Sequence, residues 1–195
     1  RFRGRVTGEV NGNVTLRKKQ YRISDDENES LKIAKNMIIG KVFNQEQLLK
    51  RTLRDHSLRV DSSSLIRVIE RLKETRETVL NCRNLDELRG AEGNASSNYF
   101  SVFDQSILQN KDFFFFRNRN RRPPLDPVNA LLSFAYSLLA SESAAAIEGV
   151  GLDSYVGFLH RDRPGRTSLA LDLMEELRPI IADRFVLKII NRKQI

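Results

Sequence analysis

Over most of the chain after residue 24, apolar residues recur every three or four positions, and this spacing constrains the fold more than any other feature. In an α-helix such residues form one stripe, which is buried against a neighbouring element. The spacing and the capping residues predict helices at about 27–50, 63–79, 84–108, 126–149, 167–178 and 179–195. We therefore expect a mostly α fold, with a multi-helical domain at residues 24–195.

Residues 1–23 have a different pattern, in which apolar and polar residues alternate around Asn11 and Gly12. Alternation on both sides of an Asn-Gly pair predicts a β-hairpin. A single hairpin is only marginally stable by itself, so this one either packs on the helices or is the cut end of a larger sheet. We favour the second interpretation.

The charge balance favours a polyanionic partner such as nucleic acid. The chain holds 33 Lys and Arg residues against 25 Asp and Glu residues, which gives a net charge of +8. Many basic proteins bind no polyanion, so charge by itself leaves the partner open. The single cysteine, Cys82, excludes a scaffold held by internal disulfides.

No membrane partner is expected. The longest apolar stretch, Val128–Ala146, is interrupted by Asn129, Tyr136, Glu142 and several serines, and is predicted to be a buried helix rather than a membrane span. The chain starts at Arg1 without a charged and then apolar leader, so it shows no sign of a secretory signal. These features predict a reduced, cytoplasmic protein.

Glu92 is the first candidate for chemistry, because Gly90 and Gly93 flank it on a predicted helix. Each glycine costs a helix about 1 kcal/mol relative to alanine. Small residues here would let a ligand approach the carboxylate closely. They would equally serve close packing of two helices, and this segment alone does not separate the two interpretations.

His160 is the second candidate, since it lies in a predicted loop and is followed by Arg161, Arg163 and Arg166. Imidazole can bind a metal or move a proton, while arginines hold phosphate oxygens. The other interpretation is a histidine with a structural role only. His56 has no comparable surroundings and is taken as structural.

Asp172 and Glu175 form the third candidate. They are three positions apart on a predicted helix and so share one face, and Glu176 is four positions from Asp172. Carboxylates on one face repel each other unless a cation lies between them, and hard divalent ions prefer carboxylate oxygens. A solvated, charged helix face would show the same pattern. No zinc-peptidase, CxxC, P-loop or GxSxG motif is present.

The segment from Phe113 to Pro124 combines a run of phenylalanines with alternating arginines and asparagines. Such a segment suits a DNA backbone, with Arg119, Arg121 and Arg122 contacting phosphates and the aromatic rings stacking on unpaired bases. The alternative places the phenylalanines in the core and the arginines in water.

Three separated stretches together resemble one known family. They are RGAEGNASSNYF, RNRRPPLDPVNALLSFAYSLL and GLDSYVGFLHRDRPGRTSLALDLMEELRP, and they are similar to sequences of the Cas1 integrases, the CRISPR-associated proteins that acquire spacers. In sequence, these stretches are most similar to the branch of the family found with type I-C systems. The front piece GEVNGNVTLRKKQYR resembles the end of the family's small β domain.

The resemblance implies a metal-dependent DNA endonuclease and integrase. Such an enzyme inserts new spacers into a CRISPR array by attack of a DNA 3′-hydroxyl on a phosphodiester, without ATP. The family has an N-terminal β domain that helps to form a homodimer and a helical C-terminal catalytic domain. The implied partners are double-stranded and branched DNA, a second copy of the chain, and the second adaptation protein, Cas2.

The resemblance also implies the site. Glu92, His160 and Glu175 correspond to the family's catalytic ligands for Mg²⁺ or Mn²⁺, and Asp172 corresponds to a nearby acid that assists or takes the third place. The loop arginines would hold DNA phosphates beside this site; they are Arg161, Arg163 and Arg166.

On this interpretation the chain is an N-terminally truncated fragment, with residues 1–23 as a remnant of the β domain and residues 24–195 as the helical catalytic domain. We expect the catalytic geometry to survive in it, and integration, which needs the assembled complex, to be absent. The alternative is a helical nucleic-acid-binding module without catalysis, and a helical scaffold that acts only by protein contacts comes third.

Overall fold

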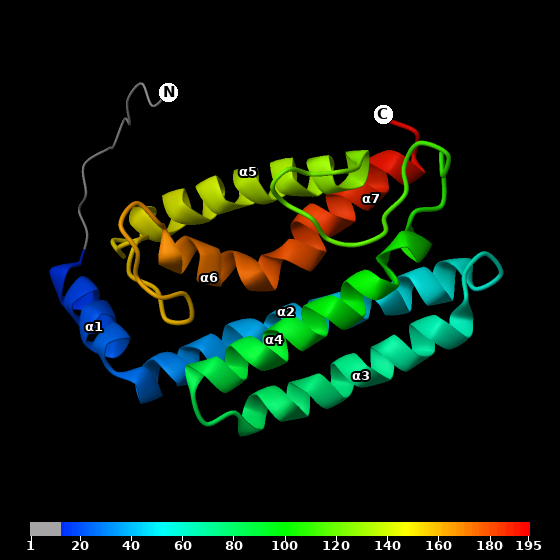
Figure 1. The fold of residues 1–195 in the computed structure, drawn as a ribbon. Coiled ribbons are helices and arrows are strands. Elements are labelled where there is room, and N and C mark those ends of the chain that lie inside the picture. Colours follow the sequence, from blue (N-terminus) through cyan, green and yellow to red (C-terminus); the bar gives the residue numbers. More distant parts are fainter. Residues whose placement is uncertain (1–12) are drawn as a thin grey trace.

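The computed structural model describes residues 13–195, and it contains helices and loops but no strand over that range (Figure 1). Its elements in chain order are α1 (Val14–Asp25), α2 (Glu27–His56), α3 (Ser62–Asn81), α4 (Leu85–Ser101), the 3₁₀ turn η1 (Phe103–Ser106), α5 (Pro127–Gly149), α6 (Ser168–Leu177), the π-helical turn η2 (Arg178–Asp183) and α7 (Arg184–Asn191). The predicted mostly α, multi-helical fold is confirmed.

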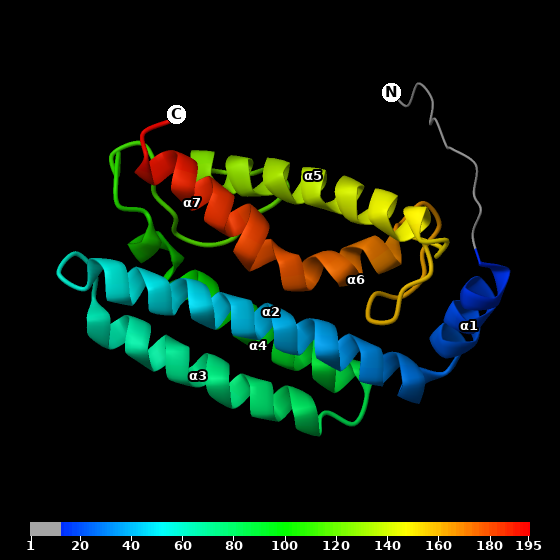
Figure 2. The same ribbon diagram turned by 180° about the vertical axis from the view of Figure 1, so that it is seen from behind.

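The helices form two layers. One contains α2, α3 and α4, and the other contains α5 together with the bent arm of α6, η2 and α7 (Figure 1). From behind, α2 lies between α3 and this arm and packs against both (Figure 2). Helix α2 thus packs against the other layer as well as against its own, and a side chain in its middle can meet residues of α4 and of α6.

The prediction that the second half of residues 1–23 forms a hairpin strand is wrong, because Val14–Asp25 is the helix α1. Asn13 caps this helix: its side-chain oxygen accepts hydrogen bonds from the amides of Thr15 (3.0 Å) and Leu16 (3.2 Å). Val14 and Leu16 remain exposed, so their alternation with polar residues does not mark the buried face of a sheet. The first strand, at residues 1–12, lies outside the described residues, and the domain division after residue 23 stays a prediction.

The starts of the helices that follow α1 were predicted closely from their capping residues. Asn84 accepts the amide hydrogen of Glu87 (2.8 Å), and Asp126 accepts that of Asn129 (2.7 Å) with Pro127 in the first turn. Helix ends were less accurate. Helix α2 continues to His56, six residues past the predicted end, and the helix expected to reach residue 108 ends at Ser101 and is followed by η1.

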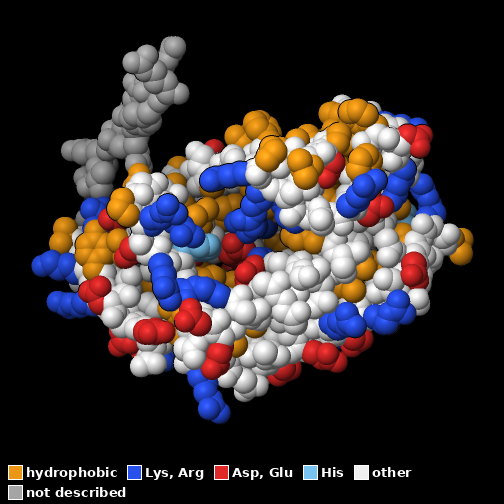
Figure 3. All heavy atoms as spheres, in the orientation of Figure 1, with side chains coloured by type: hydrophobic (Ala, Val, Ile, Leu, Met, Phe, Trp, Pro, Cys, Tyr) orange, Lys and Arg blue, Asp and Glu red, His pale blue; other side chains and the backbone are white. Residues whose placement is uncertain are grey.

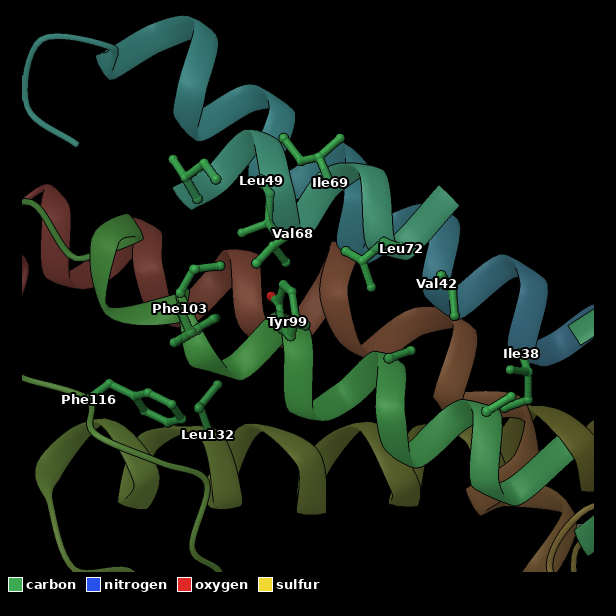
Figure 4. Packing of buried hydrophobic residues seen from close by; sticks show 14 of the residues in the cluster. Ile38, Val42, Leu49, Val68, Ile69, Leu72, Tyr99, Phe103, Phe116 and Leu132 are labelled. Carbon is green, nitrogen blue, oxygen red and sulfur yellow. The ribbon is translucent and has the colours of Figure 1, made fainter. Parts of the chain in front are cut away.

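The main core lies where α2, α3 and α4 meet, and it extends to α5 (Figure 4). The predicted apolar stripe of α3 is buried throughout; its members are Leu65, Val68, Ile69, Leu72 and Val79. In the aromatic segment, Phe114 and Phe116 join this core, whereas Phe113 and Phe115 are exposed. The alternative that places the phenylalanines in the core is thus correct for two of the four, and the contact of this segment with DNA stays a prediction.

Helix α5 is buried on one face only, so the prediction of a buried helix is wrong for its outer face. Val128, Leu132 and Ile147 are buried, but Phe134 is 65% and Leu138 is 53% exposed. Within residues 13–195, α5 is the helix that is long and apolar enough to cross a membrane by length and composition alone. Core helices of globular proteins pass the same test, and the buried face of α5 packs on α6 and η2.

Helix α1 and the loop at 151–157 hold each other in place. The side-chain amide of Gln20 donates to the carbonyl oxygens of Asp153 and Val156 (both 2.8 Å), and its oxygen accepts the Asp153 amide hydrogen (2.9 Å). The hydroxyl of Ser24 donates to the carbonyl of Gly157 (2.8 Å). The irregular loop, predicted as such, thus takes its backbone hydrogen bonds from a helix more than 130 residues earlier.

Candidate metal and nucleic-acid site

Two of the predicted metal ligands meet at a buried lysine. Glu92 comes from α4, Glu175 from α6, and Lys41 from the middle of α2. The Lys41 ammonium forms ion pairs with Glu92 Oε1 and with Glu175 Oε2, the latter at 2.7 Å, and its side chain is 4% exposed. The carboxylates of two separate helices therefore converge on a single cation.

The glycines around Glu92 do not serve helix packing. A Cβ atom built on Gly90 or Gly93 would meet nothing within 4 Å, so no neighbouring backbone requires their small size. Gly93 lines a cavity together with Glu92. The Glu92 carboxylate also accepts a hydrogen bond from Ser96 Oγ (2.8 Å), which fixes its orientation toward that cavity. The packing interpretation is therefore not supported, and close approach of a ligand to Glu92 stays a prediction.

Asp172 holds the loop that carries His160. Its Oδ2 accepts the amide hydrogens of Phe158 (2.6 Å) and Leu159 (2.9 Å), and its Oδ1 accepts that of His160 (3.0 Å). The same Oδ1 lies 2.5 Å from His160 Nδ1. This carboxylate is fully buried. Because Nδ1 is engaged, Nε2 is the imidazole nitrogen left for a metal or a proton.

Gly157 lets this loop approach α6. A Cβ atom on it would lie 2.8 Å from Asp172 Oδ2 and 2.9 Å from the carbonyl carbon of Ser168. The second atom belongs to the backbone and cannot move aside. Glycine is therefore required here for the loop to reach the Asp172 carboxylate.

Glu175 is buried yet kept ionised. Its Oε1 pairs with Arg178 Nη1 at 2.7 Å, in addition to the contact of Oε2 with Lys41. Burial acts to raise the pKa of Glu175, but the charges of Lys41 and Arg178 outweigh it, with a smaller contribution from His160, and the pKa lies below its usual value. Glu175 is thus a carboxylate at neutral pH, as a metal ligand must be.

A cavity of about 580 Å³ opens beside Lys41 and Glu92. Its walls come from α2, α4, the segment after Phe116, α5 and η2, and Figure 3 shows acidic side chains in this hollow with basic ones around it. Arg119 and Arg121 line it, as the proposed phosphate contacts require; Arg122 is exposed outside its lining. Arg117 and Arg178 line it as well, and sequence reasoning missed both.

Arg119 is more firmly fixed than a free surface arginine. Its guanidinium donates to Asn129 Oδ1 (2.7 Å) and to Ser133 Oγ (3.2 Å) on α5, and it lies 5.2 Å from the centre of the Tyr136 ring. Arg178 lies 5.1 Å from the centre of the same ring. Two guanidinium groups are therefore held by one tyrosine at the cavity wall.

Behind this tyrosine lies a buried carboxylate that the sequence did not reveal. Asp183 accepts hydrogen bonds from the hydroxyls of Tyr99 (2.9 Å) and Tyr136 (2.5 Å). Burial raises the pKa of Asp183 to about 6, although the two hydroxyls act to lower it. Burial also raises the pKa of each tyrosine well above its usual value.

The three arginines after His160 lie outside the cavity lining. Arg161 is exposed and lies 3.5 Å from Asp86, Arg163 is exposed, and Arg166 is half-buried. They share the loop that carries His160. Their role stays a prediction.

A second cavity, of about 800 Å³, lies between the C-terminal half of α2 and the arm of η2 and α7. His56 lines it, together with the exposed apolar side chains of Ile180, Ile181 and Phe185. None of the predicted site residues is part of its lining among residues 13–195. Of the predicted metal ligands, Glu92 lines the smaller cavity, whereas His160, Asp172 and Glu175 are outside its lining as well.

The donor set suits Mg²⁺ or Mn²⁺, which take carboxylate oxygens and, for Mn²⁺, imidazole nitrogen. Among residues 13–195, no three His, Cys, Asp or Glu side chains lie close enough together to hold a metal ion in this conformation. Two carboxylates nevertheless share one cation, and that cation is Lys41. The two carboxylates are chemically suited to a divalent cation, and the cation between them in this structure is the Lys41 ammonium.

Comparison with known proteins decides the family. The whole chain, residues 1–195, matches the family described as CRISPR associated protein Cas1. The chain belongs to the Cas1 family. It is 52% identical over its full length to CRISPR-associated endonuclease Cas1 2 of Rhodospirillum rubrum and 46% identical to CRISPR-associated endonuclease Cas1 1 of Chlorobaculum tepidum. It spans 57% of the length of each of these relatives.

Solved structures agree with this membership. A CAS1 protein from Thermotoga maritima superposes with a TM-score of 0.77 at 30% identity, over 94% of this chain and 55% of that one. A casposase bound to its integration product gives 0.79 at 28% identity, over 94% and 49%. A Cas6-RT-Cas1–Cas2 complex gives 0.82 at 30% identity, over 100% and 21%. The resemblance to Cas1 is confirmed, whereas the type I-C branch and the truncation stay predictions.

Proposed function

We propose that this chain is the catalytic part of a Cas1 endonuclease and integrase that inserts spacers into a CRISPR array. The observation that carries the proposal is the convergence of the Glu92 and Glu175 carboxylates on one cation, at the edge of a cavity lined by arginines. Two carboxylates held at one cation are what a divalent-metal phosphodiester site needs. A helical module that only binds DNA would have no need of them.

In this proposal Glu92, Glu175 and His160 hold the metal. Asp172 acts through His160: both of its oxygens already accept hydrogen bonds, so it orients the imidazole instead of binding the ion. When bound, Mg²⁺ or Mn²⁺ would polarise the scissile phosphodiester and stabilise the leaving 3′ oxygen. The charges of Lys41 and Arg178 hold Glu175 ionised, and the contact of Asp172 with Nδ1 leaves His160 Nε2 available.

DNA phosphates would bind in and around the cavity. Arg117, Arg121 and Arg178 line it, and Arg119 supports its wall through Tyr136. The exposed arginines outside the lining would extend this surface; they are Arg122, Arg161 and Arg163, with the half-buried Arg166 beside them. The net charge of +8 favours such a partner.

The wider assembly follows by analogy with the relatives. Similar structures include complexes of Cas1 with Cas2 and a casposase bound to an integration product. We therefore propose Cas2, a second copy of this chain, and double-stranded or branched DNA as partners, in the cytoplasm of a prokaryotic cell. The chain spans 57% of the length of these relatives, so the partners are proposed for the assembled protein.

Strand transfer on branched DNA with Mn²⁺ tests the function. A chain extended at its N-terminus to the full length of the relatives, supplied with Cas2, should join a DNA 3′-hydroxyl to a target phosphodiester, and the activity should be lost in Glu92→Gln and His160→Ala. Glu70→Gln, an exposed change on α3, serves as the control and should leave activity intact. DNA binding that weakens steeply with salt but shows no transfer would favour the non-catalytic module.

A further inference from the structure

Lys41 is an unusual residue to find at a metal site. Its side chain is almost fully buried, and its ammonium contacts the carboxylates of both Glu92 and Glu175. A cation bound there competes directly with a divalent metal for the same oxygens. Without it, the two carboxylates would face each other in a partly buried place with no cation between them, because Arg178 pairs with the other oxygen of Glu175, and such like-charge contact is costly. The lysine therefore has a function in the metal-free protein that conflicts with metal binding.

A second polar group lies one helical turn away. Gln45 is four positions after Lys41 on α2, lines the same cavity, and is 2% exposed. Its side-chain oxygen has no hydrogen-bond partner. Buried amide oxygens are nearly always hydrogen-bonded, because leaving one unpaired costs free energy. This oxygen thus lacks a donor in the arrangement where Lys41 contacts the two glutamates.

We propose that Lys41 is a resident counter-ion that a divalent metal displaces, and that Gln45 accepts the displaced ammonium. Residues four apart on a helix are neighbours, and the lysine stem has four flexible bonds, so the ammonium can reach the Gln45 oxygen without any movement of the backbone. The inference rests on the proposed metal-binding role of Glu92 and Glu175. It adds a rule of occupancy: one cation lies between the two glutamates at all times, either the ammonium or the metal.

Two substitutions should change metal affinity in opposite directions. Lys41→Met removes the competitor, so Mn²⁺ should bind at least tenfold more tightly than to wild type, as measured by the electron paramagnetic resonance of free Mn²⁺. Gln45→Met removes the second position of the ammonium, so Mn²⁺ should bind several-fold more weakly. Lys32→Met removes an exposed lysine from the same helix and should leave the affinity unchanged.

The wild-type protein provides an independent readout. Acetylation by a small reagent, followed residue by residue with mass spectrometry, should modify Lys41 slowly in EDTA and at least threefold faster in Mg²⁺, because the ammonium leaves its ion pairs for the cavity wall. The exposed Lys32 should react equally in both. This measurement does not depend on the folding of any variant.

The possible outcomes separate the inference from the proposed function. Suppose that wild type binds Mn²⁺. The displacement is then refuted, while the metal site stands, if Lys41→Met binds Mn²⁺ no more tightly than wild type, or if the rate of Lys41 acetylation does not depend on Mg²⁺. If neither wild type nor Lys41→Met binds Mn²⁺, the metal site itself is refuted. Tighter binding by Lys41→Met together with Mg²⁺-dependent acetylation supports the displacement.

Discussion

Replacing Asp183 by asparagine should change how stability depends on pH. The folded protein holds the pKa of this buried carboxyl at about 6, against 3.8 for an unperturbed aspartate. The folded state therefore favours the protonated form, which asparagine imitates. The stability that Asp183 contributes is fully present below pH 3.8 and is lost as the pH rises through about 6. Asp183→Asn should not show this loss.

The size of the effect follows from the pKa. A shift of about two units at about 1.4 kcal/mol each gives roughly 3 kcal/mol. The free energy of unfolding of Asp183→Asn, minus that of wild type, should rise by about this amount between pH 4 and pH 7. For a chain of this size that corresponds to roughly 6–12 °C in melting temperature.

Urea unfolding followed by circular dichroism at several pH values measures this difference. Asp112→Asn, at an exposed position, provides the control, and its difference from wild type should stay flat. The reasoning fails if the Asp183→Asn difference does not change between pH 4 and pH 7, or if wild type gains stability relative to the variant as the pH rises.

Three other substitutions test local features. Gly157→Ala forces a Cβ against the Ser168 backbone, so it should lower the free energy of unfolding by about 1–3 kcal/mol and weaken Mn²⁺ binding; unchanged stability would show that the loop can yield. Gly90→Ala meets no neighbour and should stabilise α4 by about 1 kcal/mol, and a loss in thermal unfolding would contradict the open space described there. Leu72→Ala removes a fully buried side chain and should cost about 2–5 kcal/mol in urea unfolding, whereas a cost below 1 kcal/mol would mean that the core collapses around the gap.

Most of the fold was predictable because its signals are local. A helix start depends on a few neighbouring residues, so Asn84 and Asp126 marked two of them correctly. The stripe of α3 likewise needs only its own sequence. Helix α1 was missed because its anchors, the carbonyls of Asp153 and Val156, lie at the other end of the chain. Local alternation of exposed side chains carried no information about that contact.

The site was predicted less completely than the fold. Family motifs pointed to Glu92, His160 and Glu175, but they gave no sign of the cation between two of them. A local signal for it did exist: Lys41 lies seven positions after Ala34 and three after Ile38, within the buried stripe of α2. A charge in an apolar stripe needs a partner. Asp183 had no such signal, since Tyr99 and Tyr136 reach it from distant helices.

The dependence of the His160 loop on α1 has a consequence for how the protein is made. The ribosome delivers α1 to α4 first, so Lys41 and Glu92 can pair while the rest of the chain is still being synthesised. The hydrogen bonds of Gln20 form only once the carbonyls of Asp153 and Val156 have been synthesised, and Glu175 is synthesised later still. The proposed metal centre can therefore be completed only after α6 has been synthesised, so its ligands cannot all meet while the earlier helices are still emerging.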